Sequence, residues 1–186
     1  MTACAHPTTP PAPGISQEPN ARLSERPLIV KPAQGEMREW RPLPGQASAG
    51  TGWGNFNLFT IKIDRQHGGS PDAWFGTEDM PPGAEIPLHR HLHEDEVLYI
   101  PSGIAHAHVG ALEGDAPGGS LIFVPRDTWV SIKNVGKTTI RLLFAFNAPG
   151  FDRYMRCESV PAGHKAPPLD TQEDARCTKL GDVQYR

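Results

Sequence analysis

A run of histidine and acidic residues gives the chain its clearest chemical signal. Positions 89–96 read His-Arg-His-Leu-His-Glu-Asp-Glu. In a strand, side chains two apart share a face, so His89 and His91 point into the same space. Imidazole nitrogens bind first-row divalent metals, and Glu96 adds a hard, charge-neutralising ligand if residues 92–95 bend and Glu96 begins the next strand. The spacing therefore predicts a metal site at His89, His91 and Glu96.

A solvated polar loop is the alternative interpretation of the same segment. Composition alone does not separate the two. The flanking segments, Pro87-Leu88 before it and the apolar run at residues 97–100 after it, argue against simple solvation, because an apolar strand needs core contacts.

Short strand signals recur along the chain, and turn residues separate them. Proline (20) and glycine (19) are unusually frequent among the 186 residues, which fits many short elements rather than long helices. Many short strands with regular turns indicate an all-β sandwich or barrel. The expected strands are Leu28–Val30, Phe56–Ile63, Ala73–Gly76, Val97–Ile100, Ala105–Val109, Ser120–Val124, Trp129–Ile132 and Thr139–Phe146.

The two ends of the chain differ from this pattern. Residues 1–27 are rich in proline and predict a disordered or extended arm. The barrel is expected over residues 28–156, and residues 157–186 are expected to be a C-terminal extension that packs on it. Helical turns are predicted at Pro149–Arg156 and Thr171–Lys179.

Charge and hydropathy exclude some function classes. The formal net charge is -3 and no basic patch stands out, so no nucleic-acid partner is expected. Apolar runs are too short to span a bilayer, so no membrane partner is expected. No secretory signal is visible, which predicts a cytoplasmic protein and leaves export open if a leader was trimmed.

The three cysteines, Cys4, Cys157 and Cys177, are too few for a disulfide framework. Cys157 and Cys177 can pair if their backbones approach. Unpaired thiols in a reducing cytoplasm are the simpler expectation.

The histidine segment also carries a family resemblance. Gly83, His89, His91, Glu96 and Gly103 stand at the offsets of the first motif of the cupin superfamily, without a gap or exception. Both glycines match turn positions of that motif, where a side chain would strain the backbone.

Further along the chain, Gly119–Pro125 followed by Asn134 resembles the second cupin motif. Residues 147–154 are similar to the segment that follows the barrel in single-domain, quercetin-dioxygenase-like cupins. The resemblance covers roughly residues 55–156.

The resemblance implies a single jelly-roll barrel that holds one divalent metal ion, with Fe, Mn, Ni, Cu and Zn all open. It implies a small-molecule substrate or ligand. It also implies a homodimer, in which residues 28–32 are candidates for an exchanged strand.

The second motif departs from the family at two positions. Val130 stands where the family has a metal-binding histidine, and Asp127 stands where it has a glycine. Three outcomes stay open: a site of two histidines and one glutamate completed by water or substrate, a substitute ligand from His93, His106 or His108, or loss of the metal. Of the substitutes, His106 and His108 share a strand face that is more simply read as outward.

The first functional hypothesis is a metal-dependent, dioxygenase-like enzyme that acts on a small aromatic or enol-containing molecule. Glu96 is then both a ligand and the candidate catalytic base. A cupin isomerase, lyase or cyclase on the same metal is a close alternative. The second hypothesis, motivated by Val130, is a non-catalytic cupin that binds a small molecule.

Overall fold

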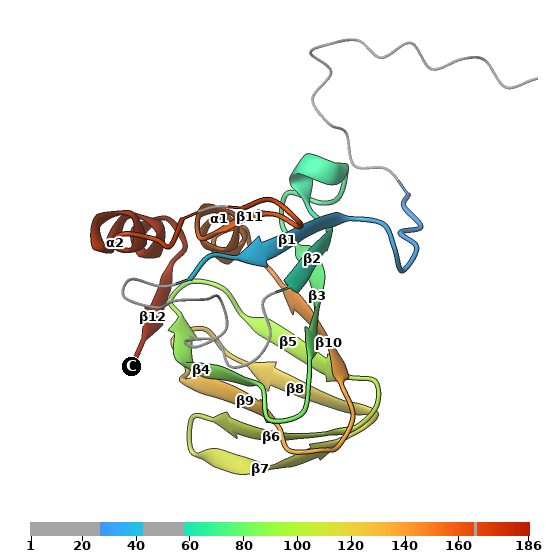
Figure 1. Ribbon diagram of the computed structural model, residues 1–186. Coiled ribbons are helices and arrows are strands. Elements are labelled where there is room, and N and C mark those ends of the chain that lie inside the picture. The colour runs from blue at the N-terminus through green and yellow to red at the C-terminus, as the bar shows by residue number, and fades with distance from the viewer. Residues whose placement is uncertain (1–26, 43–57, 166) are drawn as a thin grey trace, which may run out of the picture.

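The computed structural model describes residues 27–42, 58–165 and 167–186. In these ranges the chain forms two β-sheets and two helices, with one short 3-10 helix at Arg65–His67 (Figure 1). The elements are β1 (Glu36–Trp40), β2 (Leu58–Ile63), β3 (Trp74–Met80), β4 (Glu85–His91), β5 (Glu96–Ile100), β6 (Ile104–Val109), β7 (Leu112–Pro117), β8 (Ser120–Val124), β9 (Val130–Asn134), β10 (Ile140–Phe146), α1 (Phe151–Cys157), β11 (Ser159–Pro161), α2 (Thr171–Leu180) and β12 (Val183–Tyr185).

The two sheets pack as the layers of a jelly-roll barrel. One sheet has the strand order β11-β1-β2-β3-β10-β5-β8, and the other has the order β12-β4-β9-β6-β7. The strand pairs within both sheets are antiparallel. This architecture confirms the predicted all-β jelly-roll class.

Alternating burial explains why the sheets enclose one core. In β10 every second side chain is buried, from Ile140 through Leu142 and Phe144 to Phe146. Period-two burial is typical of a strand with one face on a core. The inward side chains of both sheets join a single apolar cluster.

Most of the predicted strands are confirmed, with ends that shift by a few residues. Ser120–Val124 matches β8 at both ends, and Thr139–Phe146 matches β10 within one residue. Ala73–Gly76 is too short, because β3 continues to Met80. The start of the predicted Phe56–Ile63 strand lies outside the described residues, as do almost all of the predicted arm at 1–27 and Cys4.

The predicted strand at Leu28–Val30 is wrong. The chain has no regular structure there, and Ile29 is 91% exposed. Prolines 27 and 32 lack the N–H that a sheet ladder needs, which favours an extended segment without pairing. Within the residues that the structure describes, the first strand is instead β1, which the sequence did not reveal.

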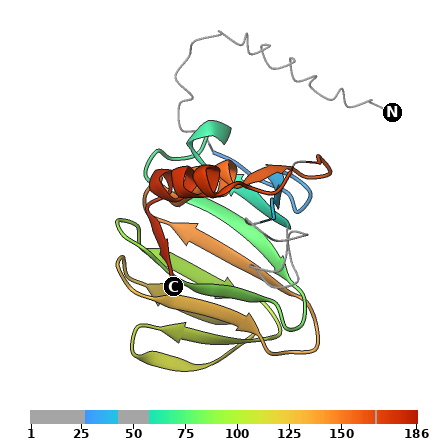
Figure 2. The same ribbon diagram turned by 60° about the vertical axis from the view of Figure 1, so that its left-hand side comes forward.

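The C-terminal segment is part of the barrel as well as a cover for it. β11 pairs with β1, and β12 pairs with β4, so the segment adds an edge strand to each sheet. Figure 2 shows α2 lying across one end of the barrel, with β12 running down beside the sheet. None of the helices in the described ranges has the length and apolarity that a membrane crossing requires.

A disulfide joins the two helices of this cover. Cys157, the last residue of α1, is bonded to Cys177 of α2, with the Cα atoms 5.4 Å apart. The expectation of unpaired thiols is therefore wrong for this pair. The sequence could not decide it, because pairing depends on how closely the two helices pack. Since disulfides are uncommon in a reducing cytoplasm, the bond does not support the location that free thiols suggested.

Candidate metal centre

Three side chains converge inside the barrel where the sequence predicted them. His89 and His91 come from β4, and Glu96 is the first residue of β5. Each offers one ligand atom, and these atoms lie within 4.8 Å of one another. The three residues are 4%, 2% and 5% exposed, so they are withdrawn from bulk water. The buried grouping excludes a solvated loop.

A bulge in β4 aims the two histidines inward. Ile86 pairs with Ile132, and His89 pairs with Val130. Between these two pairs β4 therefore contains one residue more than β9. An extra residue shifts the parity of a strand. As a result Ile86 and His89 both point into the core although they are three residues apart. Pro87 lies within the bulge, where a missing N–H costs no ladder bond.

The surroundings of His89 select one of its nitrogens for coordination. Its Nδ1–H donates to the carbonyl of Pro87 at 2.7 Å, which leaves Nε2 with the free lone pair. The ring stacks on Tyr185 of β12, with centroids 5.6 Å apart. The C-terminal strand therefore helps to hold this ligand in position.

His91 is enclosed by aromatic rings and is short of polar partners. Phe151 of α1 and Phe146 of β10 meet its ring edge-on, with centroids 4.5 and 4.9 Å away. Among the described residues, neither ring nitrogen of His91 has a hydrogen-bond partner. An unsatisfied buried imidazole is costly, and a metal ion would satisfy the nitrogen that coordinates it. The donor set thus fits a divalent metal.

Glu96 reaches the histidines because the chain bends before it. Residues 92–95 are irregular, and β5 starts at Glu96, as the sequence predicted. Its Oε2 lies 3.7 Å from Nε2 of His91. The side chains that alternate with it, Leu98 and Ile100, are buried in the core, which fixes the inward direction of the carboxyl.

Burial sets the protonation of the three groups without a metal. It lowers the pKa of His89 to about 4, against a smaller opposite effect of the Pro87 and Val130 carbonyls. Burial and the neighbouring His89 lower the pKa of His91 well below its usual value. Burial raises the pKa of Glu96 to about 8, helped by nearby carboxyls. Both imidazoles are therefore neutral, which is the form that binds metals.

Val130 fills the position of the family's fourth ligand. It is fully buried and lies directly opposite His89 in the β4–β9 pair. Nearby, Asp127 has φ +60°, the left-handed conformation that the family satisfies with glycine. Gly83 and Gly103 have φ +80° and +88°, as expected for turn glycines. The chain thus keeps the turn conformations that the motifs require, and it lacks the histidine ligand at position 130.

The structure does not bring the three substitute ligands to the site. The His93 side chain is 80% exposed and contacts Asp182 at 2.6 Å. His106 and His108 alternate with the buried Ala105 and Ala107 on β6, so they point outward, as expected. The parity of β6 and the bend after His91 explain these positions.

Glu94 is a buried carboxyl that the sequence analysis missed. It is 1% exposed, and its Oε1 accepts from the backbone N–H of Phe151 at 2.6 Å. The indole of Trp74 donates to its other oxygen at 3.4 Å. A Cβ at Gly150 would collide with Glu94. Glu94 therefore fixes the start of α1, and with it the ring of Phe151 on His91.

A small cavity lies beside the ligands. Its volume is about 20 Å³, and its polar lining comes from Glu78, His89, Glu96 and the Trp40 indole among apolar side chains. Glu78 was also missed, although the alternation of β3 places it in line with the buried Trp74. Such a volume holds about one water molecule.

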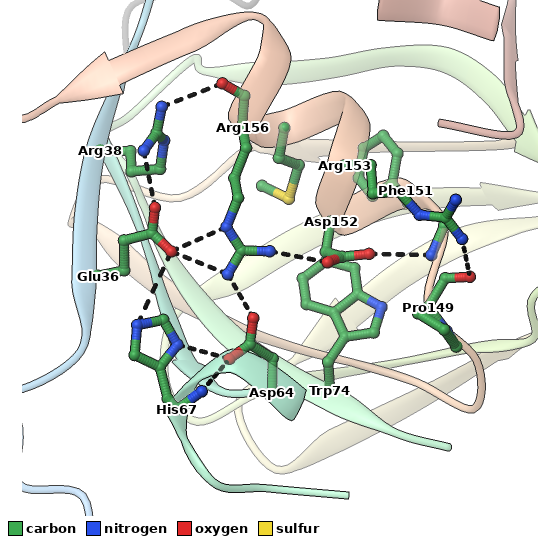
Figure 3. Close-up of polar contacts among 12 residues, drawn as sticks. Glu36, Arg38, Asp64, His67, Trp74, Pro149, Phe151, Asp152, Arg153 and Arg156 are labelled. Carbon is green, nitrogen blue, oxygen red and sulfur yellow. Dashed lines mark hydrogen bonds and ion pairs between the residues drawn. The ribbon is translucent and has the colours of Figure 1, made fainter. Parts of the chain in front are cut away.

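A separate ionic cluster anchors α1 from the other side (Figure 3). Arg156 donates to Glu36 at 2.8 Å, to Asp152 at 2.7 Å and to Asp64. His67 contacts Asp64 in turn. Three acidic side chains thus share one partly buried guanidinium, and α1 is tied to β1 and to the turn after β2.

Comparison with known proteins relates this architecture to a protein family. The family model described as Cupin domain matches residues 76–146, from β3 to the end of β10. The chain contains a cupin domain. The matched range includes the three ligands of the candidate centre. Among curated proteins, none matches this chain.

Solved cupin-like structures resemble the chain over part of its length. The cupin domain of Cnp3 from Schizosaccharomyces pombe is 27% identical, with a TM-score of 0.45, over 50% of this chain and 64% of that domain. A predicted oxalate decarboxylase from Thermotoga maritima is 20% identical, with a TM-score of 0.53, over 66% of this chain and all of that one. The second likeness supports the fold and leaves the reaction open.

Proposed function

We propose that this cupin domain binds one divalent metal ion through His89, His91 and Glu96 and acts as a metal-dependent, dioxygenase-like enzyme. The observation that carries the proposal is the buried convergence of one ligand atom from each of these three residues. Among the described residues, neither imidazole nitrogen of His91 has a hydrogen-bond partner that would compete with a metal. Two histidines and one carboxylate with open positions are typical of non-haem iron oxygenases. The proposed substrate is a small aromatic or enol-containing molecule.

The ligands of this chain have distinct roles in the proposal. His89 is held by Pro87 and Tyr185, so its coordinating nitrogen keeps one direction. Glu96 supplies negative charge and is the candidate base for a substrate hydroxyl. A metal held by these residues would supply Lewis-acid and redox chemistry toward dioxygen or a chelating substrate.

Access to the centre requires movement of its cover. The cavity of about 20 Å³ admits a water molecule and is too small for an aromatic ring. Phe151 of α1 lies on His91, and Tyr185 of β12 lies on His89. Displacement of α1 or β12 is therefore part of the proposed turnover.

Nitric oxide provides a test that does not depend on the substrate. The Fe²⁺-loaded protein is expected to bind nitric oxide and to give the electron paramagnetic resonance signal of a high-spin iron–nitrosyl adduct, because three protein ligands would leave coordination positions of the iron open. His91→Ala is the control and is expected to lose the signal. A loaded wild-type protein with no adduct would exclude the oxygenase proposal, and oxygen uptake with enediols and catechols then identifies substrates.

A non-catalytic small-molecule-binding cupin is the second candidate, and the closed cavity and buried Val130 favour it. An isomerase, lyase or cyclase is a third form of the same metal centre. Oxygen uptake separates the oxygenase from both.

We also propose that the chain forms a homodimer through the outer face of the larger sheet. Phe75, Leu121, Phe123 and Leu143 are exposed there, and strand pairing sets them in two adjacent rows across β3, β10, β5 and β8. A contiguous exposed apolar patch is typical of an interaction surface. Exchange of residues 28–32 between subunits stays a prediction.

Light scattering tests the dimer. The expected mass is twice the 20.3 kDa of the chain, and Phe123→Asp is expected to reduce it to that of the monomer. Leu112→Asp is the matched control, because Leu112 is 75% exposed on β7 of the other sheet. A monomeric wild-type protein would refute the proposal.

A further inference from the structure

Two carboxyls from different strands face one internal cavity. Glu78 of β3 and Glu96 of β5 both line it, together with His89 of β4. Glu78 is 6% exposed, and the alternation of β3 directs it inward between Gly76 and Met80. The position of Glu78 is therefore fixed by the strand and does not depend on a flexible loop.

The contacts of Glu78 leave part of its carboxyl available to the cavity. The Trp40 indole N–H donates to Oε1 at 3.1 Å, which orients the group. Glu78 is not one of the three residues whose ligand atoms lie within 4.8 Å of one another. The cavity between them has room for about one water molecule.

The cavity lacks a positive charge of its own. Within the part of the chain that the structure describes, no lysine or arginine lines it, and neither carboxyl forms an ion pair with one. A buried carboxylate without a cation is strongly unfavourable. Two carboxylates and two neutral imidazoles balance the charge of one divalent cation.

We propose that Glu78 is a fourth member of the metal centre, supplying its second negative charge across a water-sized gap. This inference rests on the proposed metal site at His89, His91 and Glu96. Glu78 replaces in function, though not in position, the ligand that Val130 removes from the family's set. A water molecule held between Glu78 and the metal would be a hard oxygen ligand, which favours Mn²⁺ or Fe²⁺ over softer ions.

Metal titration of the full chain tests the proposal. Calorimetry with Mn²⁺ is expected to show one site in the wild type and binding at least about tenfold weaker in Glu78→Gln, the size expected for a group that supports metal ligands. Glutamine keeps an acceptor for Trp40. Glu158→Gln is the matched control, because Glu158 is a fully buried carboxyl outside the cavity, and its affinity is expected to stay within about twofold of wild type.

Two further measurements separate a charge effect from a packing effect. Glu78→Asp keeps the charge and is expected to regain part of the Mn²⁺ affinity, and the spectrum of bound Mn²⁺ is expected to change in Glu78→Gln. Equal losses in the Asp and Gln variants, or wild-type affinity in Glu78→Gln, would overturn the inference. A wild-type chain that binds no metal would instead overturn the proposed function.

Discussion

Two buried acidic clusters meet α1, and they differ in whether the chain supplies a cation. On one side Arg156 neutralises Glu36 and Asp64. On the other side Glu78 and Glu96 share a cavity that no described lysine or arginine lines. Burial acts on all four carboxyls, so the different outcomes depend on the partner.

The pKa values express this difference. Burial raises the pKa of Glu36 and Asp64, but the hydrogen bonds and charge of Arg156 overcome it, and both values fall below normal. Arg38 adds to this effect on Glu36, and His67 adds to it on Asp64. Burial raises the pKa of Glu78 and Glu96 to about 8, and no cation offsets it. Without a metal, the two cavity carboxyls therefore hold their protons at neutral pH, whereas Glu36 and Asp64 stay ionised beside Arg156.

Removing the guanidinium is expected to have the largest effect. Arg156→Met removes the cation that Glu36, Asp64 and Asp152 share, and it leaves only Arg38 beside Glu36 and His67 beside Asp64. It is expected to lower the free energy of unfolding by about 3 kcal/mol, the low end for breaking a buried pair. Chemical denaturation measures the change. Arg141→Met is the control, because the exposed Arg141–Asp79 pair is expected to contribute about 1 kcal/mol or less. Similar losses in both variants would show that the Arg156 cluster contributes no more to stability than an exposed ion pair.

The pH dependence of the metal-free protein tests the other cluster. The folded pKa of Glu78, about 8, lies above its unfolded value of 4.5, so its contribution to stability is complete below pH 4.5 and is lost as the pH rises through 8. Between about pH 5 and about pH 7.5 this loss is about 3 kcal/mol, at about 1.4 kcal/mol per unit. Glu78→Gln removes it, so the variant is expected to gain stability relative to wild type as the pH rises. Parallel thermal melting curves would contradict the assignment.

Glu94 is an intermediate case and is expected to show the smallest effect. Its pKa is raised to about 7 by burial, against the opposite effect of N–H donors from Phe151 and Trp74. Glu94→Gln keeps the acceptor for the Phe151 N–H and is expected to cost within about 1 kcal/mol in unfolding free energy. Glu94→Ala removes the acceptor, and a loss no greater than that of the Gln variant would show that Glu94 does not fix α1.

The sequence predicted the ligands better than their surroundings. His89, His91 and Glu96 follow from strand parity, one bend and motif spacing, all of which are local. The bulge at Pro87 depends on how β4 pairs with β9, and the alternation of residues within β4 alone does not reveal that pairing. Glu78 lies four residues after Trp74, so strand alternation places both on the same, buried face. A carboxyl in a strand is also compatible with an exposed position, so the sequence alone did not identify Glu78 as buried.

Long-range contacts limited the prediction elsewhere. Arg156 reaches Glu36 across 120 residues and Asp64 across 92, so no local pattern could group them. β11 and β12 have three residues each, too few for a recognisable alternation. β7 is absent from the predicted strands, because it is mostly exposed and contains glycine and proline.

The most direct test of the central claim is the amount of divalent metal that the untagged, purified chain binds. We expect one equivalent per chain for the wild type, and affinity weakened about a hundredfold or more in His91→Ala, because that variant loses a ligand. Elemental analysis after equilibrium dialysis against Mn²⁺, Fe²⁺ and Zn²⁺ measures both. Less than about a tenth of an equivalent in the wild type, or equal binding by His91→Ala, would contradict a metal centre at His89, His91 and Glu96.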